Sequence, residues 1–311
     1  MSEKENQVGA AELEFETLNE QEHHSHEHHH HHHKHRSKVK PVMYTVMAFF
    51  LSLVLFLLSG CMVLYFSIFS KDYMIGTMKS IGYSDMVRSE LQVRLEDLVS
   101  AGGFDKGFAE KFAAGYDVQK AVEEYITSFY SGESTLIDTT GFKQDLYLAI
   151  NEYIREKGIT VSDSAQSSIA YFVNEAADIY VDQISITFFS TIANYIYKSR
   201  TILNITTAVL AVIALVIIAV IYLTNEYKHR RSKYLFYATA GGFLAVLALP
   251  CIFFMTNKLK NINLNTRSLY NLFVNYFNGM FSQFYIWAGV LFIISVIVFL
   301  LYRRHYLHAT A

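Results

Sequence analysis

The chain is poor in residues that build disulfide-stabilised or turn-rich folds, with two cysteines and two prolines in 311 residues. Both cysteines, Cys61 and Cys251, lie within apolar runs, and the segment from Lys71 to Arg200 contains none. A small extracellular scaffold held by disulfides is therefore excluded, because such scaffolds are rich in paired cysteines. The same scarcity favours a bacterial plasma membrane protein over a product of an oxidising secretory pathway.

Histidine is also missing between Lys71 and Arg200. Without histidine or cysteine, that segment cannot hold a Ser-His or Cys-His nucleophile pair or a usual zinc site. The segment has nineteen acidic and twelve basic residues, but neighbouring acids such as Glu123 and Glu124 point to different sides of a helix. We interpret the acids as a solvated face, predict a protein that is not an enzyme, and identify no catalytic residue. A two-carboxylate hydrolase is the enzyme class that stays open.

Four long apolar runs contain no Asp, Glu, Lys, Arg or His. About 20 apolar residues in a helix cross a bilayer, so we predict transmembrane helices at residues 42–69, 201–223, 234–256 and 284–302. Charged residues inside spans are typical of ion pathways, and their absence disfavours a coupled transporter. The predicted fold class is an all-α membrane protein with four transmembrane helices and an all-helical extracytoplasmic domain inserted between helices 1 and 2.

The basic residues that flank these runs predict the orientation. They are Lys34, Arg36, Lys38 and Lys40 before the first run, Lys228, Arg230, Arg231 and Lys233 between the second and third, and Arg303 and Arg304 after the fourth. The positive-inside rule places both termini in the cytoplasm, together with the link at 224–233 and the tail at 303–311. Residues 70–200 and 257–283 are then outside, although the second of these segments also carries basic residues.

The stretch "LSGC", Leu58 to Cys61, has the form of a bacterial lipoprotein cleavage site. A cleaved signal has a short apolar core close to the start of the chain. Here about 40 residues precede the core, and the apolar run continues beyond Cys61. We therefore favour an uncleaved span over processing.

Apolar residues between the first two runs recur with helical spacing. Four helices are predicted: 87–98, ended by the glycines at 102 and 103; 118–129, capped by Asp117; 142–153, capped by Thr140 and ended by Gly158; and one that starts at Asp163 with Gln166 in capping-box register. From Ser162 to Leu223 the chain has no glycine or proline, so the fourth helix is expected to continue through the second span as a rod of about 90 Å. A flexible joint near 198–200 is the alternative.

Residues 257–283 contain an amphipathic stripe. Its members are Leu269, Leu272, Phe273, Tyr276, Phe277 and Met280. We predict that this extracytoplasmic amphipathic loop either lies on the outer membrane surface or packs under the outer domain.

The first 41 residues contain ten of the thirteen histidines, seven glutamates before Glu27 and no apolar periodicity, which predicts a disordered cytoplasmic tail. Neutral imidazoles bind zinc, nickel or copper. The candidate metal ligands are His24, His26, His28, His29, His30, His31, His32, His33 and His35. The irregular flanks of this tract favour a native sequence over a purification tag. Metal bound there would be held loosely, and no other cofactor is expected.

These patterns favour a non-enzymatic sensor or a regulatory or accessory subunit, whose helical outer domain binds a ligand or envelope partner. The expected partners are the lipid bilayer and a membrane protein or further copies of this chain, with no nucleic acid. A channel or transport-associated component is the alternative, and it would need a polar seam through the spans. Candidate residues for that seam are Ser52, Ser59, Ser67, Asn204, Thr206 and Thr207, which also serve in ordinary helix packing.

Overall fold

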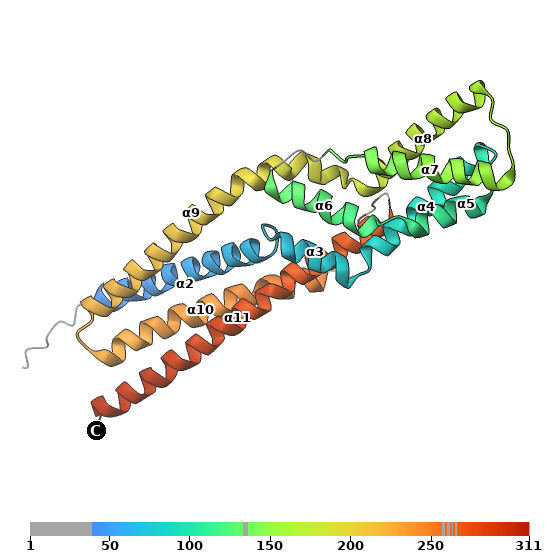
Figure 1. The fold of residues 1–311 in the computed structure, drawn as a ribbon. Helices are drawn as coiled ribbons and strands as arrows, with labels where there is room; N and C mark the ends of the chain where they lie inside the picture. The colour runs from blue at the N-terminus through green and yellow to red at the C-terminus, as the bar shows by residue number, and fades with distance from the viewer. Residues whose placement is uncertain are drawn as a thin grey trace, which may run out of the picture. The chain divides into compact units, whose positions relative to one another are not determined.

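The computed structural model describes residues 39–132, 136–256, 259, 262, 264 and 266–310. Every long element in this part of the chain is an α-helix (Figure 1). The helices are α2 (Val39–Phe66), α3 (Lys71–Ser80), α4 (Tyr83–Ala101), α5 (Lys106–Gly115), α6 (Val118–Ser131), α7 (Thr140–Lys157), α8 (Asp163–Ile184), α9 (Thr187–Thr224), α10 (Lys228–Thr256) and α11 (Arg267–Thr310). The described residues from Met43 onward form one compact unit.

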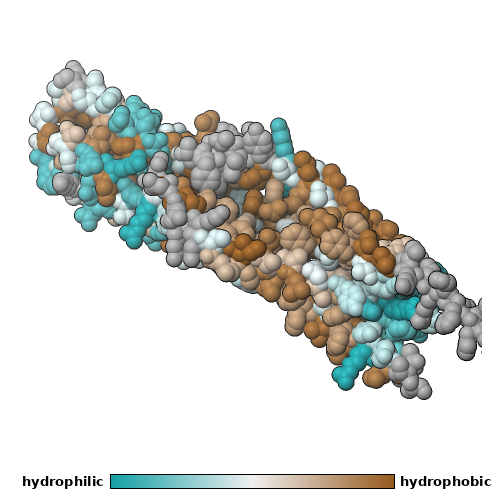
Figure 2. All heavy atoms as spheres, turned by 180° about the vertical axis from the view of Figure 1, so that it is seen from behind, coloured by the Kyte–Doolittle hydropathy of each residue, from teal (hydrophilic) through white to brown (hydrophobic). Residues whose placement is uncertain are grey.

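Four of these helices are long and apolar enough to cross a membrane, which confirms the four predicted apolar helices. The candidate spans are Lys40–Phe66, Ile196–Thr224, Lys228–Thr256 and Arg267–Leu307. Large apolar side chains such as Ile202, Leu215 and Ile297 are exposed on them, as a lipid-facing surface requires. Figure 2 shows hydrophobic residues covering this part of the face in view, with hydrophilic residues gathered beyond it on both sides.

The candidate spans pack through apolar and small residues. Helices α10 and α11 lie side by side (Figure 1), and a core that includes Val246 and Phe284 also takes in Val63 of α2. Helix α2 approaches α10 at Gly242, where an added Cβ would lie 3.3 Å from the Cβ of Leu55. Small residues are typical of helix contacts in lipid, because apolar burial gives little driving force there.

The predicted link at 224–233 is shorter in the structure, since α10 begins at Lys228 and takes up the basic residues. Side chains bond to the backbone carbonyl groups at the C-terminal end of α9. Arg231 Nε donates a hydrogen bond to the carbonyl oxygen of Asn225 at 2.6 Å, and the Tyr44 hydroxyl donates to that of Thr224 at 3.0 Å. Carbonyl groups at a helix C-terminus have no partner within the helix, so these bonds satisfy them.

Helices α3 to α8, called the α3–α8 region below, enclose one apolar core. Helices α4, α6, α7 and α8 correspond to the four predicted helices, whereas α3 and α5 were not predicted. Asp117 caps α6 by accepting a hydrogen bond from the Lys120 N–H, and Gly158 ends α7 with a φ of 64°, as expected. Thr140 is the first residue of α7 rather than its cap, because Thr139 occupies the cap position.

The continuous helix predicted from Ser162 to Leu223 is wrong, because the structure breaks it at Ser185 and Ile186. Ile184 and Ile186 are both 1% exposed in the core. Residues two apart in a helix point to different sides, whereas extended backbone between them lets both side chains enter the same core. The carbonyl oxygen of Ile186, the residue at the N-cap of α9, also accepts a hydrogen bond from the Tyr125 hydroxyl at 3.3 Å. The alternative joint near 198–200 is also wrong, since α9 is helical there.

The predicted loop at 257–283 is a helix from Arg267 onward, and α11 continues from there through the fourth apolar run. Part of its apolar stripe, Leu269, Leu272 and Tyr276, packs against the helical region, whereas Phe277 and Met280 pack in the core with Val63 and Val246. Leu272 is 3% exposed within the core of the α3–α8 region. The Tyr73 hydroxyl of α3 also donates a hydrogen bond to the carbonyl oxygen of Tyr276 at 3.0 Å.

Phe142 is the first test of this core. Its ring is fully buried and stacks on Tyr180, with centroids 4.4 Å apart. Truncation of a buried phenylalanine costs about 3–5 kcal/mol through lost apolar contacts and the remaining cavity. We expect Phe142→Ala to lower the thermal unfolding midpoint of the full chain in detergent, measured by circular dichroism. Leu148→Ala, at a 58% exposed position of the same helix, is the control and should change little. Equal effects of the two would contradict the core assignment.

Gly279 tests the contact between α3 and α11. The Tyr73 hydroxyl lies directly against Gly279 and leaves no room for a Cβ. Gly279→Ala should displace Tyr73, break its bond to Tyr276 and destabilise the chain by about 1–3 kcal/mol in thermal unfolding. Gly289→Ala on the same helix is the control, since no atom lies within 4 Å of its added Cβ. An unfolding midpoint that is the same for both variants would show that the contact is not tight.

Candidate functional site

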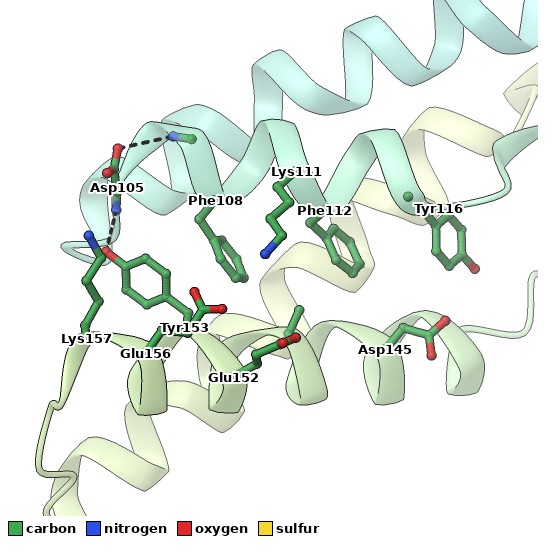
Figure 3. A pocket seen from close by; sticks show the side chains of 13 residues that line it. Asp105, Phe108, Lys111, Phe112, Tyr116, Asp145, Glu152, Tyr153, Glu156 and Lys157 are labelled. Carbon is green, nitrogen blue, oxygen red and sulfur yellow. Dashed lines mark hydrogen bonds between the residues drawn. The ribbon is translucent and has the colours of Figure 1, made fainter.

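A groove of about 420 Å³ lies between α5 and α7 (Figure 3). Its α5 side presents Phe108, Phe112 and Tyr116, which lie on one helix face because they recur every four residues. Figure 3 shows these rings directed toward α7. On the α7 side, the small side chain of Ala149 leaves the space between the helices open.

The aromatic wall of the groove is supported from behind. Phe112 and Tyr116 contact the ring of Phe142 edge-on, with centroid distances of 5.4 and 5.3 Å. The hydroxyls of Tyr116 and Tyr180 are 3.4 Å apart. Burial raises the pKa of Tyr116, the bond with Tyr180 acts in the opposite direction, and the nearby Asp145 carboxylate adds to the rise. The wall is therefore continuous with the core of the α3–α8 region.

Asp105 closes one end of the groove. Its Oδ1 accepts a hydrogen bond from the Gly107 N–H at 3.2 Å and so caps α5. Its own N–H donates to the Tyr153 hydroxyl of α7 at 3.3 Å. One residue thus starts α5 and ties it to α7, which sets the spacing of the two helices at this end.

Carboxylates line the α7 side of the groove. Asp145, Glu152 and Glu156 are separated by seven and four residues, so they share a helix face with Ala149. In the part of the chain that the structure describes, none of these three carboxylates forms an ion pair or hydrogen bond. They are therefore open to a ligand.

Two lysines, Lys111 and Lys157, also line the groove, against four carboxylates when Asp105 is included. Lys157 Nζ lies 5.6 Å from the centroid of the Tyr153 ring, a distance at which an ammonium is attracted to the face of an aromatic ring. The lining is thus anionic overall, and one of its aromatic rings already holds a cation.

A second polar cluster joins the α3–α8 region to α11. The Glu90 carboxylate accepts hydrogen bonds from the Ser268 N–H at 3.0 Å, the Ser268 hydroxyl at 2.6 Å and Gln183 Nε2 at 2.6 Å. Thr266 completes the start of α11 by accepting from the Leu269 N–H at 3.3 Å. A carboxylate at a helix N-terminus is favoured by the free N–H groups and the helix dipole. Ser268 and Gln183 are 1% and 5% exposed, so the cluster is largely shielded from water.

The candidate metal ligands in the tract from His24 to His35 lie outside the described residues. Over residues 39–132 and 136–256 and the described positions beyond them, no group of three His, Cys, Asp or Glu side chains could hold a metal ion.

Glu123 forms an ion pair with Lys79 at 3.1 Å and Glu124 a longer one with Lys120 at 3.9 Å. Bonds to Gln119 and Lys79 lower the pKa of the Glu123 carboxyl.

The hydroxyls proposed for a polar seam bond mainly to their own helices. Ser52, Ser59, Ser67 and Thr207 donate to backbone carbonyls three or four residues earlier. Asn204 and Thr206 are exposed on α9. The structure therefore does not bring these six residues together.

Neither the groove between α5 and α7 nor the cluster around Glu90 was predicted from the sequence. The four-residue spacing of Phe108, Phe112 and Tyr116 was a signal for α5, but the glycines at 107 and 115 obscured it. The bond from Ser268 to Glu90 had no sequence signal, since 178 positions separate the two residues.

No known protein family model, curated protein or solved structure matches this chain. The function is therefore argued from the geometry alone.

Tyrosine ionisation gives a test of the core of the α3–α8 region, which includes Tyr83 and packs against Tyr130. Burial, followed by the charge of Glu90, raises the pKa of Tyr83, and burial raises the pKa of Tyr130 to about 12. In the unfolded chain both return to about 10, so the unfolded state releases protons that the folded state retains. The contribution of these two tyrosines to the free energy of unfolding is therefore complete below pH 10. It falls as pH rises from 10 to 12, by about 1.4 kcal/mol per pH unit for each group.

Urea unfolding of the full chain between pH 8 and 11.5 measures this fall. Tyr83→Phe should be less sensitive to pH above 10 than wild type, because one titrating group is gone. Identical slopes in Tyr83→Phe and wild type would show that Tyr83 does not contribute.

Proposed function

We propose that this chain is a non-enzymatic, multi-pass membrane protein that acts as a sensor or as a regulatory or accessory subunit. The α3–α8 region is the extracytoplasmic ligand-binding or partner-binding part, and both termini are cytoplasmic, in a bacterial plasma membrane. Support for the orientation comes from the basic residues beside the spans. The partner is a second membrane protein or a further copy of this chain.

The observation that carries the proposal is the polar cluster of Glu90, Gln183 and Ser268, called the Glu90 junction below. Three helices meet at this carboxylate: α4, which bears it, α8 through Gln183 and α11 through Ser268. Because α11 continues into a candidate span, a change in the α3–α8 region that altered these bonds would tilt or shift α11.

One buried acceptor of the junction lacks a partner, which favours a second arrangement of α8. Gln183 Oε1 is buried and has no hydrogen-bond partner among the described residues. A buried acceptor without a partner costs about 1–3 kcal/mol. A movement of α8 that gave Gln183 a donor would recover this energy and offset lost bonds elsewhere, as a two-state element requires.

The route from the groove to the junction is short. Tyr116, which lines the groove, contacts Tyr180 of α8. Tyr180 and Gln183 are three residues apart and therefore lie on one face of α8. A ligand that moved Tyr116 would act on the helix that bears a partner of Glu90.

Release of the junction by mutation tests the proposal without any ligand. The chain for this experiment carries Cys61→Ser and Cys251→Ser. Spin labels are attached at Glu226→Cys, in the link between α9 and α10, and at Arg303→Cys, in the last third of α11. Pulsed electron paramagnetic resonance in lipid nanodiscs then measures the distance between them. We expect Glu90→Ala to shift or broaden this distance by about 1–2 Å, the size of helix shifts in signalling proteins.

Glu96→Ala is the matched control, because Glu96 is on the same helix and bonds to Gln92 of its own helix. It should leave the distance distribution unchanged. If Glu90→Ala folds with the wild-type circular dichroism spectrum and gives the wild-type distribution, the proposed coupling is absent. Ion-selective conductance of the wild-type chain in liposomes would instead support the alternative of a channel or transport-associated component.

A further inference from the structure

We infer that the groove between α5 and α7 binds a linear aliphatic polyamine. The inference rests on the proposed function, because it names the class of ligand that the α3–α8 region would detect. It combines three features of the groove: the spacing of its carboxylates, its aromatic wall and its open centre.

The carboxylates match a chain of separated positive charges. At a rise of 1.5 Å per residue, the backbone positions of Asp145 and Glu152 are about 10 Å apart along the axis of α7, and those of Glu152 and Glu156 about 6 Å apart. None has a protein partner in the described chain. A single metal ion needs its ligands around one point, and no group of three such side chains is close enough among the residues described. Ammonium groups joined by alkyl spacers can bond to each carboxylate in turn.

The aromatic wall suits the alkyl spacers and the ammonium groups alike. Phe112 and Tyr116, which are half-buried, present apolar ring surface along the groove opposite the carboxylates, whereas Phe108 lines the groove from a largely buried position against Phe104. Ammonium groups are attracted to the faces of aromatic rings by the ring quadrupole. The position of Lys157 Nζ over Tyr153 is an example within the groove itself. A polyamine would place the same chemical group over the neighbouring rings.

The shape of the groove favours a slender ligand. Ala149 is at the centre of the α7 face, between Asp145 and Glu152, and both ends of the lined surface extend beyond it. A linear chain can lie across Ala149 parallel to the helices. The two groove lysines reduce the net negative charge without cancelling it, so a ligand with two or more positive charges is favoured over one with a single charge.

Isothermal titration calorimetry with spermine tests the inference on the full chain in nanodiscs of zwitterionic lipid. We expect saturable binding by wild type and at least a tenfold weaker affinity for Glu152→Gln with Glu156→Gln. The matched control is Glu110→Gln with Glu175→Gln, which removes the same charge at exposed positions outside the groove. It should bind spermine as wild type does.

A second variant tests the shape of the groove independently of its charge. Ala149→Leu fills the centre of the groove without changing any charge, and it should also weaken spermine at least tenfold. The neutral probe 1,8-octanediol should not bind. The inference is overturned if wild type does not bind spermine at millimolar concentration, if the two charge variants weaken binding equally, if Ala149→Leu binds like wild type, or if Mg²⁺ at equal charge displaces spermine.

The outcome is distinguishable from that of the proposed function. The Glu90→Ala distance measurement uses no ligand, so it can succeed where spermine fails to bind, and the sensor would then have another ligand. Spermine binding together with an unchanged distance in Glu90→Ala would leave a binding protein without the proposed coupling.

Discussion

The bond between the Glu90 carboxylate and the N-terminus of α11 is the constraint on which the arrangement of this chain depends. A helix of 44 residues is about 65 Å long, so a small change of angle at its start moves its far end by a large distance. Bonds to an ionised group contribute about 1.5–3 kcal/mol each, and Glu90 makes three, to backbone and side chains of two other helices. The carboxylate therefore fixes where α11 begins and how it meets α4 and α8.

The features that could be predicted from the sequence are those that depend on neighbours in the chain. An apolar run needs only its own length and composition to form a span, and Asp117 caps the helix that starts at the next residue. The break at Ser185 and Ile186 depends instead on a core built by other helices, in which Ile184 and Ile186 are both buried. Neither glycine nor proline marks such a break, because packing rather than backbone preference causes it.

The groove also combines local features that the sequence contains with a long-range pairing that it does not. Each of its faces is visible in the sequence as a helical repeat, with rings on α5 and carboxylates on α7. What the sequence does not contain is that the two faces oppose each other. That pairing is set by the cap at Asp105 and its bond to Tyr153, which bring together segments 48 residues apart. The carboxylates are exposed, as a solvated acidic face requires, and the structure adds the aromatic wall opposite them.

The two polar sites are also connected in a way that explains why α8 ends where it does. Tyr180 holds the aromatic wall through Tyr116, and Gln183, one turn later, bonds to Glu90. If α8 continued into α9 as one helix, Ile184 and Ile186 would point to different sides and could not both stay in this core. The break therefore ends α8 one residue after Gln183, with Tyr180 and Gln183 bonded to Tyr116 and Glu90.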